Sequence, residues 1–152
     1  MKIRIFNILI LVSLQIILSC DNNDNLELQS DPITFQEIGK GALYGNSAEG
    51  ISQSNMIITN AIDWQNLMIK MNSVNNVTDN FTETDIDFDN FMVIAIFLEV
   101  KGNGWEVKIN KIMENETKII VSTQETEYAN TVMTQPFHIV KMWKSDKSIL
   151  FE

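Results

Sequence analysis

The stretch FMVIAIFLEV, residues 91–100, begins with eight consecutive apolar residues. Several of them are β-branched or aromatic, and these residue types favour strands. The run lacks the polar alternation that marks a strand with one solvated face. Such a continuous apolar run is typical of a strand that is buried on both faces. We therefore expect residues 91–100 to form a central strand that is covered on both sides.

The segments that follow this run also have the features of strands. The residues KGNG at 101–104 predict a turn. In residues 105–110, apolar residues alternate with polar ones, as they do in a half-buried strand. We expect three further strands over residues 118–124, 136–142 and 148–152. The C-terminal half of the chain is therefore predicted to consist mainly of β-strands.

The predicted strand over residues 136–142 begins with Pro136, at a position where its missing N–H group is tolerated. Alternation along a strand places its residues on two faces. One face carries Phe137, Ile139 and Lys141, and the other carries His138, Val140 and Met142. His138 is the only histidine of the chain, and we expect it to be a sheet residue with one side in solvent.

An amphipathic helix is predicted upstream, over residues 61–71. Asn60 is a suitable N-cap, and Asp63 in the first turn interacts favourably with the helix dipole. The spacing i, i+3, i+4, i+7 brings four apolar side chains to one face. These residues are Trp64, Leu67, Met68 and Met71. We interpret this face as a core face and not as a ligand-binding surface.

The remaining upstream residues predict short strands separated by loops. Strands are expected over residues 33–38 and 55–59. Four glycines punctuate residues 39–50, which we predict to be rich in loops, and residues 72–85 form a long polar loop. The sequence thus predicts a single α+β domain over residues 33–152, with a mainly antiparallel β-sheet and one early amphipathic helix.

The first nineteen residues have the layout of a secretory signal peptide. Lys2 and Arg4 precede an apolar stretch that runs to Leu18. That stretch is shorter than the ~20 residues that a membrane-spanning helix needs. An uncleaved N-terminal anchor is the alternative interpretation of residues 1–19.

Residues 17–20 read Ile-Leu-Ser-Cys, and Cys20 is the only cysteine of the chain. This tetrapeptide resembles the lipobox of bacterial lipoproteins. The resemblance implies cleavage before Cys20, lipidation of its thiol and acylation of the new amino group, so that the protein is anchored in the cell envelope on the periplasmic or cell-surface side. Residues 20–32 would then be the lipidated cysteine and a flexible acidic tether. A free cysteine in an ordinary secreted protein is the alternative.

The chain is strongly acidic, with a net charge of −9. Cleavage after residue 19 removes Lys2 and Arg4 and no acidic residue, so the mature net charge becomes about −11. Such a protein is repelled by nucleic acid. We expect a neutral or basic partner, and no nucleic acid.

Motifs of known chemistry are not found in the sequence. The acids of residues 85–89 suggest a calcium loop, but that loop needs glycine at its sixth and an acid at its twelfth position, where the chain has Asn90 and Ile96. A lone His138 cannot form a two-histidine metal site, and no GxSxG or SxxK motif marks a nucleophile. We expect no metal, no cofactor and no catalytic residue. An enzyme would need acidic side chains that converge with His138 or a lysine.

The segments IDFDNFMVIAIFLEVKGNGWEVKINKI (residues 86–112) and TQPFHIVKMWKSDKSILF (residues 134–151) resemble the C-terminal domain of the PrcB family, a protease-complex subunit. The shared features are an Asp-Phe pair before an apolar strand, a turn with glycine, an alternating strand and a late strand that starts with Pro and an aromatic residue. The resemblance covers residues 53–151 and is closest over residues 86–151.

This resemblance implies a non-catalytic lipoprotein that binds or stabilises an extracytoplasmic partner, for which a secreted subtilisin-type protease complex is the candidate. The partner would dock on a sheet edge or on the loops between strands. The candidate contact residues are Trp105, Pro136, Phe137, His138 and Trp143. The alternative is a domain that binds a small ligand or a glycan, on which Trp105, Trp143 and Tyr128 would stack.

Overall fold

The structure is a computed structural model that describes residues 30–102, 104–129 and 131–152. The predicted signal peptide, the lipidation site Cys20 and residues 21–29 of the predicted tether lie outside the described residues. Within the described part of the chain, no helix is long and apolar enough to cross a membrane. The described residues belong to the predicted domain and to the last three positions of the predicted tether.

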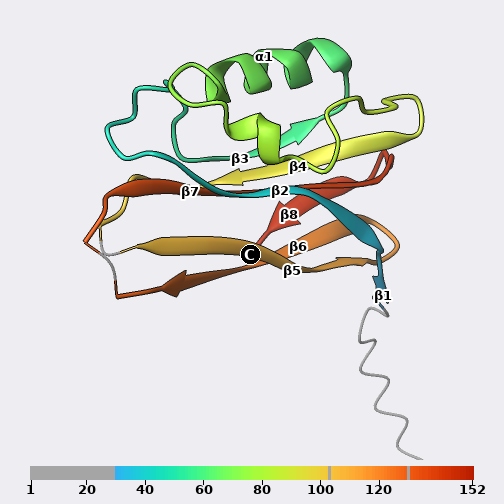
Figure 1. The fold of residues 1–152 in the computed structure, drawn as a ribbon. Helices are drawn as coiled ribbons and strands as arrows, with labels where there is room; N and C mark the ends of the chain where they lie inside the picture. Colours follow the sequence, from blue (N-terminus) through green and yellow to red (C-terminus); the bar gives the residue numbers. More distant parts are fainter. Residues whose placement is uncertain (1–29, 103, 130) are drawn as a thin grey trace, which may run out of the picture.

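Two four-stranded sheets stack face to face, and one helix covers the outer face of one sheet (Figure 1). The sheet under the helix, called the covered sheet, has the strand order β2 (Phe35–Tyr44), β7 (Thr134–Trp143), β4 (Phe91–Phe97), β3 (Ser54–Ile58). The second sheet has the order β1 (Asp31–Pro32), β5 (Trp105–Glu114), β6 (Lys118–Glu127), β8 (Ser148–Phe151). The helices are α1 (Ala61–Met71) and the 3₁₀ helix η1 (Val77–Asn80).

The predicted fold class is confirmed, because the domain is mainly antiparallel β-sheet with one early α-helix. Two features of the topology were not predicted. The strands divide between two sheets, and β8 pairs with β6 in parallel while all other pairs are antiparallel. The chain passes from the second sheet to the covered sheet between β1 and β2.

Strand β4 lies between β7 and β3, and all its residues except the first are buried. Val93, Ala95 and Phe97 face the apolar cluster under α1. Ile94 and Ile96 face the cluster between the two sheets. The prediction of a central strand covered on both sides is thus confirmed, although the strand ends at residue 97 and not at residue 100.

Strand β7 has the same double burial. Phe137 and Ile139 belong to the cluster under the helix, whereas Val140 and Met142 belong to the cluster between the sheets. Burying an apolar side chain of this size contributes about 1.5–3 kcal/mol to stability. The two central strands therefore stabilise both apolar clusters at once.

Helix α1 has the predicted bounds and the predicted cap. The Asn60 side chain accepts a hydrogen bond from the Asp63 N–H (3.0 Å) and donates one to the Asp63 carboxylate (2.7 Å). Trp64 is buried, its indole N–H donates to the Thr84 carbonyl (2.8 Å), and its ring stacks on Phe81. The helix is therefore held on the covered sheet by its apolar face and by the segment that follows η1.

Strand β2 continues through residues 39–44, which the four glycines led us to predict as loop; that expectation was wrong. The glycines serve close packing within a strand. A Cβ atom on Gly39 would overlap the ring of Phe81, and one on Gly41 would touch the ring of Phe137 at 3.5 Å. Glycine occurs both in turns and where a side chain packs closely against the backbone, so a glycine in the sequence does not distinguish the two.

Residues 72–85 form the predicted polar connection, but this connection is hydrogen-bonded to the rest of the domain. The Asn72 side chain accepts from the Thr78 N–H (3.0 Å) and donates to the Thr78 hydroxyl (2.6 Å). The Thr82 N–H donates to the Ile38 carbonyl in β2 (2.8 Å). The segment therefore closes over one side of the helix and one edge of the covered sheet.

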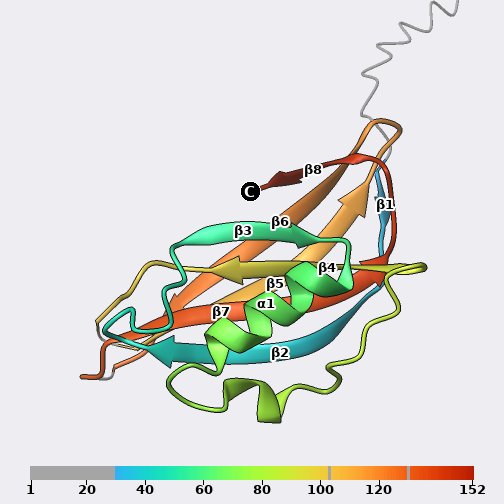
Figure 2. The same ribbon diagram turned by 90° about the horizontal axis from the view of Figure 1, so that it is seen from above.

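The described chain begins at one end of the sandwich, called the near end (Figure 2). Asp31 and Pro32 pair with Glu114 and Met113 at the C-terminal end of β5. The Lys147 ammonium donates to the Glu114 carboxylate (2.9 Å), which places the β7–β8 connection at this end as well.

The opposite end, called the far end, carries the β2–β3, β4–β5 and β6–β7 connections. Lys101 and Thr134 exchange backbone hydrogen bonds of 2.9 and 3.0 Å there, and the Tyr128 N–H donates to the Gly104 carbonyl (2.7 Å). Because β5 and β7 have ten residues each, the two ends are about 30 Å apart.

We expect Gly39→Ala to lower the free energy of unfolding by about 1–3 kcal/mol, because the added methyl group must displace the Phe81 ring. Urea denaturation measures this change. Gly102→Ala is the matched control, since a Cβ atom there meets nothing within 4 Å. Adding Phe81→Leu to Gly39→Ala should recover part of the loss. Equal stability of the two single variants would contradict this packing.

Candidate functional site

The structure separates the five predicted contact residues into buried and accessible ones. Pro136, Phe137 and His138 are buried in β7. Their side chains cannot reach a partner that docks on the folded domain, because β7 has strands on both edges and apolar layers on both faces. Trp105 is half-buried at the far end, and Trp143 is 62% exposed at the near end.

His138 links the two sheets through its imidazole ring. Its Nδ1 accepts a hydrogen bond from the Ile109 N–H of β5 (2.8 Å), and its Nε2 lies 2.9 Å from a Glu37 carboxylate oxygen. A bulge in β5 lies directly after Ile109. These partners require a neutral ring with its proton on Nε2. The expectation that one side of His138 is solvated was wrong, since only 1% of the residue is exposed.

Burial lowers the pKa of His138, and the hydrogen bond with Glu37 opposes this shift. The positive charges of Lys40 and Lys108 lower the pKa further. Protonation would also turn the Nδ1 acceptor into a donor that faces another N–H group. His138 therefore links the two sheets as a neutral imidazole, and both ring nitrogens are occupied.

Several lysines form ion pairs with carboxylates, and Lys40 also interacts electrostatically with Glu37 and His138. Lys40 pairs with Glu106 at 2.9 Å, and the hydrogen bond between them raises the pKa of Lys40. Lys141 lies within 2.7 Å of both carboxylate oxygens of Glu83. Among the described residues, no group of three or more His, Cys, Asp or Glu side chains is placed to hold a metal ion.

The acids before β4 form a local turn. Asp87 accepts hydrogen bonds from the Asn90 side chain (2.8 Å) and from the Asp89 N–H (3.0 Å). These hydrogen bonds hold the pKa of the Asp87 carboxyl group below its usual value. The carboxylate thus helps to form the turn that leads into the central strand.

Large exposed apolar side chains gather at the far end. They are Tyr44, Tyr128, Val132 and Met133, each of which is more than half exposed. Tyr44 pairs with Thr134 at the end of β2. The end of β2 and the β6–β7 connection thus bring these four residues, called the far-end rim, to the same end of the sandwich.

The three aromatic residues of the predicted stacking surface do not share one end. Tyr128 lies beside Gly104, directly before Trp105, at the far end. The Lys101 ammonium lies 4.0 Å from the centre of the Trp105 ring and so occupies one of its faces. Trp143 lies at the near end, where it stacks on Phe91 with 4.5 Å between the ring centres.

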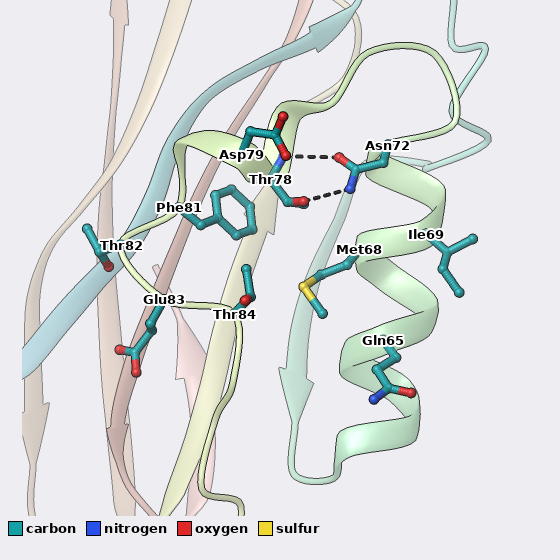
Figure 3. Close-up of a pocket in the computed structure, with 10 residues that line it drawn as sticks. All are labelled: Gln65, Met68, Ile69, Asn72, Thr78, Asp79, Phe81, Thr82, Glu83 and Thr84. Carbon is teal, nitrogen blue, oxygen red and sulfur yellow. Dashed lines mark hydrogen bonds between the residues drawn. The ribbon is translucent and has the colours of Figure 1, made fainter.

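A hollow of about 920 Å³ lies between α1 and the segment that follows η1 (Figure 3). Met68, Ile69 and Phe81 supply its apolar lining. Much of its polar lining is already hydrogen-bonded, because Asn72 binds Thr78 as described above. These two polar side chains are therefore engaged with each other and not directed at a ligand.

No protein-family model matches this sequence, and neither a curated protein nor a solved structure matches it. The resemblance to the PrcB family therefore stays a prediction. Of the far-end rim, Tyr128 was named from the sequence as a stacking residue. Tyr44, Val132 and Met133 were not singled out, because they lie outside the strands that we predicted. Apolar residues such as Val132 and Met133 within a polar connection are the only local signal.

The free energy of unfolding should fall as the pH falls below about 6.5, the ordinary pKa of histidine. Above that pH His138 is neutral in both states. Below it, the unfolded chain binds a proton that the folded protein binds only at lower pH, because burial lowers the pKa of His138. The slope is at most about 1.4 kcal/mol per pH unit for one group.

Urea denaturation between pH 7 and pH 5 measures this dependence. His138→Gln should flatten the slope, since a glutamine oxygen can accept the Ile109 N–H without titrating in this range. Glu37→Gln should preserve or steepen it, because the hydrogen bond to Glu37 raises the pKa of His138. Equal slopes in the wild type and in His138→Gln would show that His138 does not cause the dependence.

Proposed function

We propose that this chain is a lipid-anchored, non-catalytic binding module of the cell envelope, which docks an extracytoplasmic protein on its far-end rim. One observation carries the proposal: the described chain begins at the near end, while Tyr44, Tyr128, Val132 and Met133 are exposed at the opposite end. A module tethered through its N-terminus would present this apolar rim away from the membrane.

The length of the predicted tether supports this orientation. Residues 20–29 join the proposed lipid to the domain. A flexible chain of this length has a root-mean-square span of about 18 Å and a maximum near 35 Å. The near end would therefore stay close to the membrane. The far end, about 30 Å further along the strands, would reach the surrounding space.

The chemistry of the rim supports a protein partner. Tyrosine and methionine are enriched at protein interfaces, where they bury large contact areas. The net charge of −9 favours a neutral or basic partner. A secreted subtilisin-type protease complex is the candidate that the family resemblance supplies. The non-catalytic role is part of the proposal, and it is supported by the hydrogen bonds that occupy both nitrogens of His138.

Binding of a glycan or a small ligand has less support. Stacking on a sugar ring requires exposed aromatic faces on one surface. Trp105 and Tyr128 share the far end, but Lys101 already occupies one face of Trp105. Trp143 lies at the other end of the sandwich.

Cys20→Ser should abolish labelling of the protein with radioactive palmitate and release it from the membrane fraction. Two or more acyl chains are needed for a stable hold, at about 0.8 kcal/mol per buried CH₂ group. Ser19→Thr is a conservative control that leaves the thiol in place. Retention of both the label and the membrane association by Cys20→Ser would refute the lipid anchor.

A photoreactive amino acid at position 128 or 133 should crosslink the partner in intact cells, whereas one at position 143 should not. Trp143 is the matched control, because it is 62% exposed but lies at the near end. Mass spectrometry identifies the crosslinked protein, and tagging that protein should recover this chain in return. Equal crosslinking from both ends, or none from the far end, would contradict docking on the rim.

A further inference from the structure

Hydrogen bonds from other segments cover part of the strand edge on three flanks of the two sheets. The backbone and hydroxyl of Thr82 donate to the Ile38 and Glu37 carbonyls along the free edge of β2 (2.8 and 2.9 Å). β1 and the Ile33 N–H, which donates to Ile112 (2.9 Å), cover the last three residues of the β5 edge. β8 covers the first four residues of the β6 edge. The fourth flank, the outer edge of β3, is different.

Outermost strands usually carry features that prevent a further strand from pairing, such as short length, proline, charge or a bulge. β1 has two residues and includes Asp31 and Pro32, and the four residues of β8 lie between Lys147 and Glu152. β3 has five residues, SNMII, without charge or proline, and its register with β4 is uninterrupted. Among the described residues, its backbone pairs only with β4 (Figure 2).

A hollow of about 370 Å³ adjoins this edge, between β3 and α1. Ile51, Met56 and Leu67 give it an apolar lining. Because side chains alternate along a strand, a strand added to β3 would direct every second side chain toward the helix side of the sheet. One of these side chains could enter the hollow.

The opposite face of β3 also offers an apolar contact. Ile57 is 44% exposed, and it points away from the helix because Met56 and Ile58 pack into the cluster under α1. Cross-strand pairs of apolar side chains stabilise neighbouring strands. A strand that pairs with β3 would therefore cover Ile57 with its other set of side chains.

We propose that the β3 edge captures an extended, uncharged or basic segment of the partner protein as an additional strand, with one apolar side chain in the hollow beside α1. This inference deepens the proposed binding function and rests on it. Backbone hydrogen bonds would supply the affinity, and the hollow would supply the selectivity.

Net negative charge argues against two occupants of the β3 edge that this chain could supply, a second copy of the domain and its own residues 21–29. A second copy would bring a net charge of −9 to a surface of the same sign, over a strand of only five residues. Residues 21–29 carry three acids and no basic residue. Asp63 and Lys70 both line the hollow, so the preference for a neutral or basic segment comes from the net charge of the chain and not from the hollow itself. A neutral or basic segment of another protein is the complementary occupant.

A fluorescent heptapeptide that alternates valine with lysine is the first probe, added to the full-length lipidated protein in detergent micelles. Fluorescence anisotropy should show saturable binding. Methylation of the peptide's alternate backbone amides, or exchange of its lysines for glutamates, should weaken binding by about tenfold or more. No binding of the lysine peptide, or no effect of amide methylation, would overturn strand capture.

Ile57→Lys places a charge on the edge and should also weaken binding by about tenfold. Ile62→Lys is the matched control, because Ile62 is 72% exposed on α1, outside the lining of this hollow, and gains the same charge. Both variants change exposed side chains, so both should fold, and circular dichroism verifies this. Equal binding by the two variants would overturn the assignment of the edge.

Crosslinking in intact cells distinguishes this inference from the proposed function. A photoreactive residue at Asn55, which is exposed on β3, should crosslink an extended neutral or basic segment of the same partner that position 128 recovers. A crosslink from position 128 without one from position 55 would overturn strand capture and leave the proposed function standing. A crosslink from position 55 to a second copy of this chain would overturn the inference in favour of a dimer. The absence of any crosslink from positions 55 and 128 would overturn both proposals.

Discussion

Double-sided burial of β4 and β7 is the constraint on which the rest of this structure depends. A strand that is apolar on both faces is stable only where two separate layers exclude water from it. The second sheet supplies one layer, with Val107 and Ile112 among its buried residues. Helix α1 supplies the other through Trp64 and Leu67. The three-layer arrangement follows from these two strands.

The helix layer brings further requirements. The buried indole N–H of Trp64 needs an acceptor, which the Thr84 carbonyl provides. The segment after η1 must therefore return across the sheet, and on its way it places Phe81 against Gly39 and Thr82 along β2. The need to satisfy the buried indole N–H of Trp64 thus helps to hold the long polar connection of residues 72–85 in place.

Periodicity in the sequence predicted those elements whose environment is local. The apolar run of β4 and the spacing of Trp64, Leu67 and Met71 each report directly on burial. The helix therefore has its predicted bounds, and β4 begins where predicted but ends three residues earlier. The loop predicted at Gly39 was wrong because glycine is needed there to make room for the ring of Phe81, which is forty-two positions away in the sequence. The burial of His138 likewise depends on Glu37 and Ile109, which no local pattern connects to it. Of the predicted contact residues, Trp105 and Trp143 have accessible surface in the structure. The sequence did not indicate Tyr44 and Met133, because their place at the far end follows from the strand topology.

The orientation of β2 has a mechanical consequence. The chain pairs briefly with β5 through β1 at the near end and then enters β2, whose nine residue pairs with β7 lie along one axis. A pull on the N-terminus along that axis would load this ladder in shear, so that its hydrogen bonds share the force and do not open one after another. Strand β7 passes the load to β4 through a second ladder in the centre of the sheet. A module held at its N-terminus and loaded at its opposite end is thus built to bear tension across its most deeply buried strands.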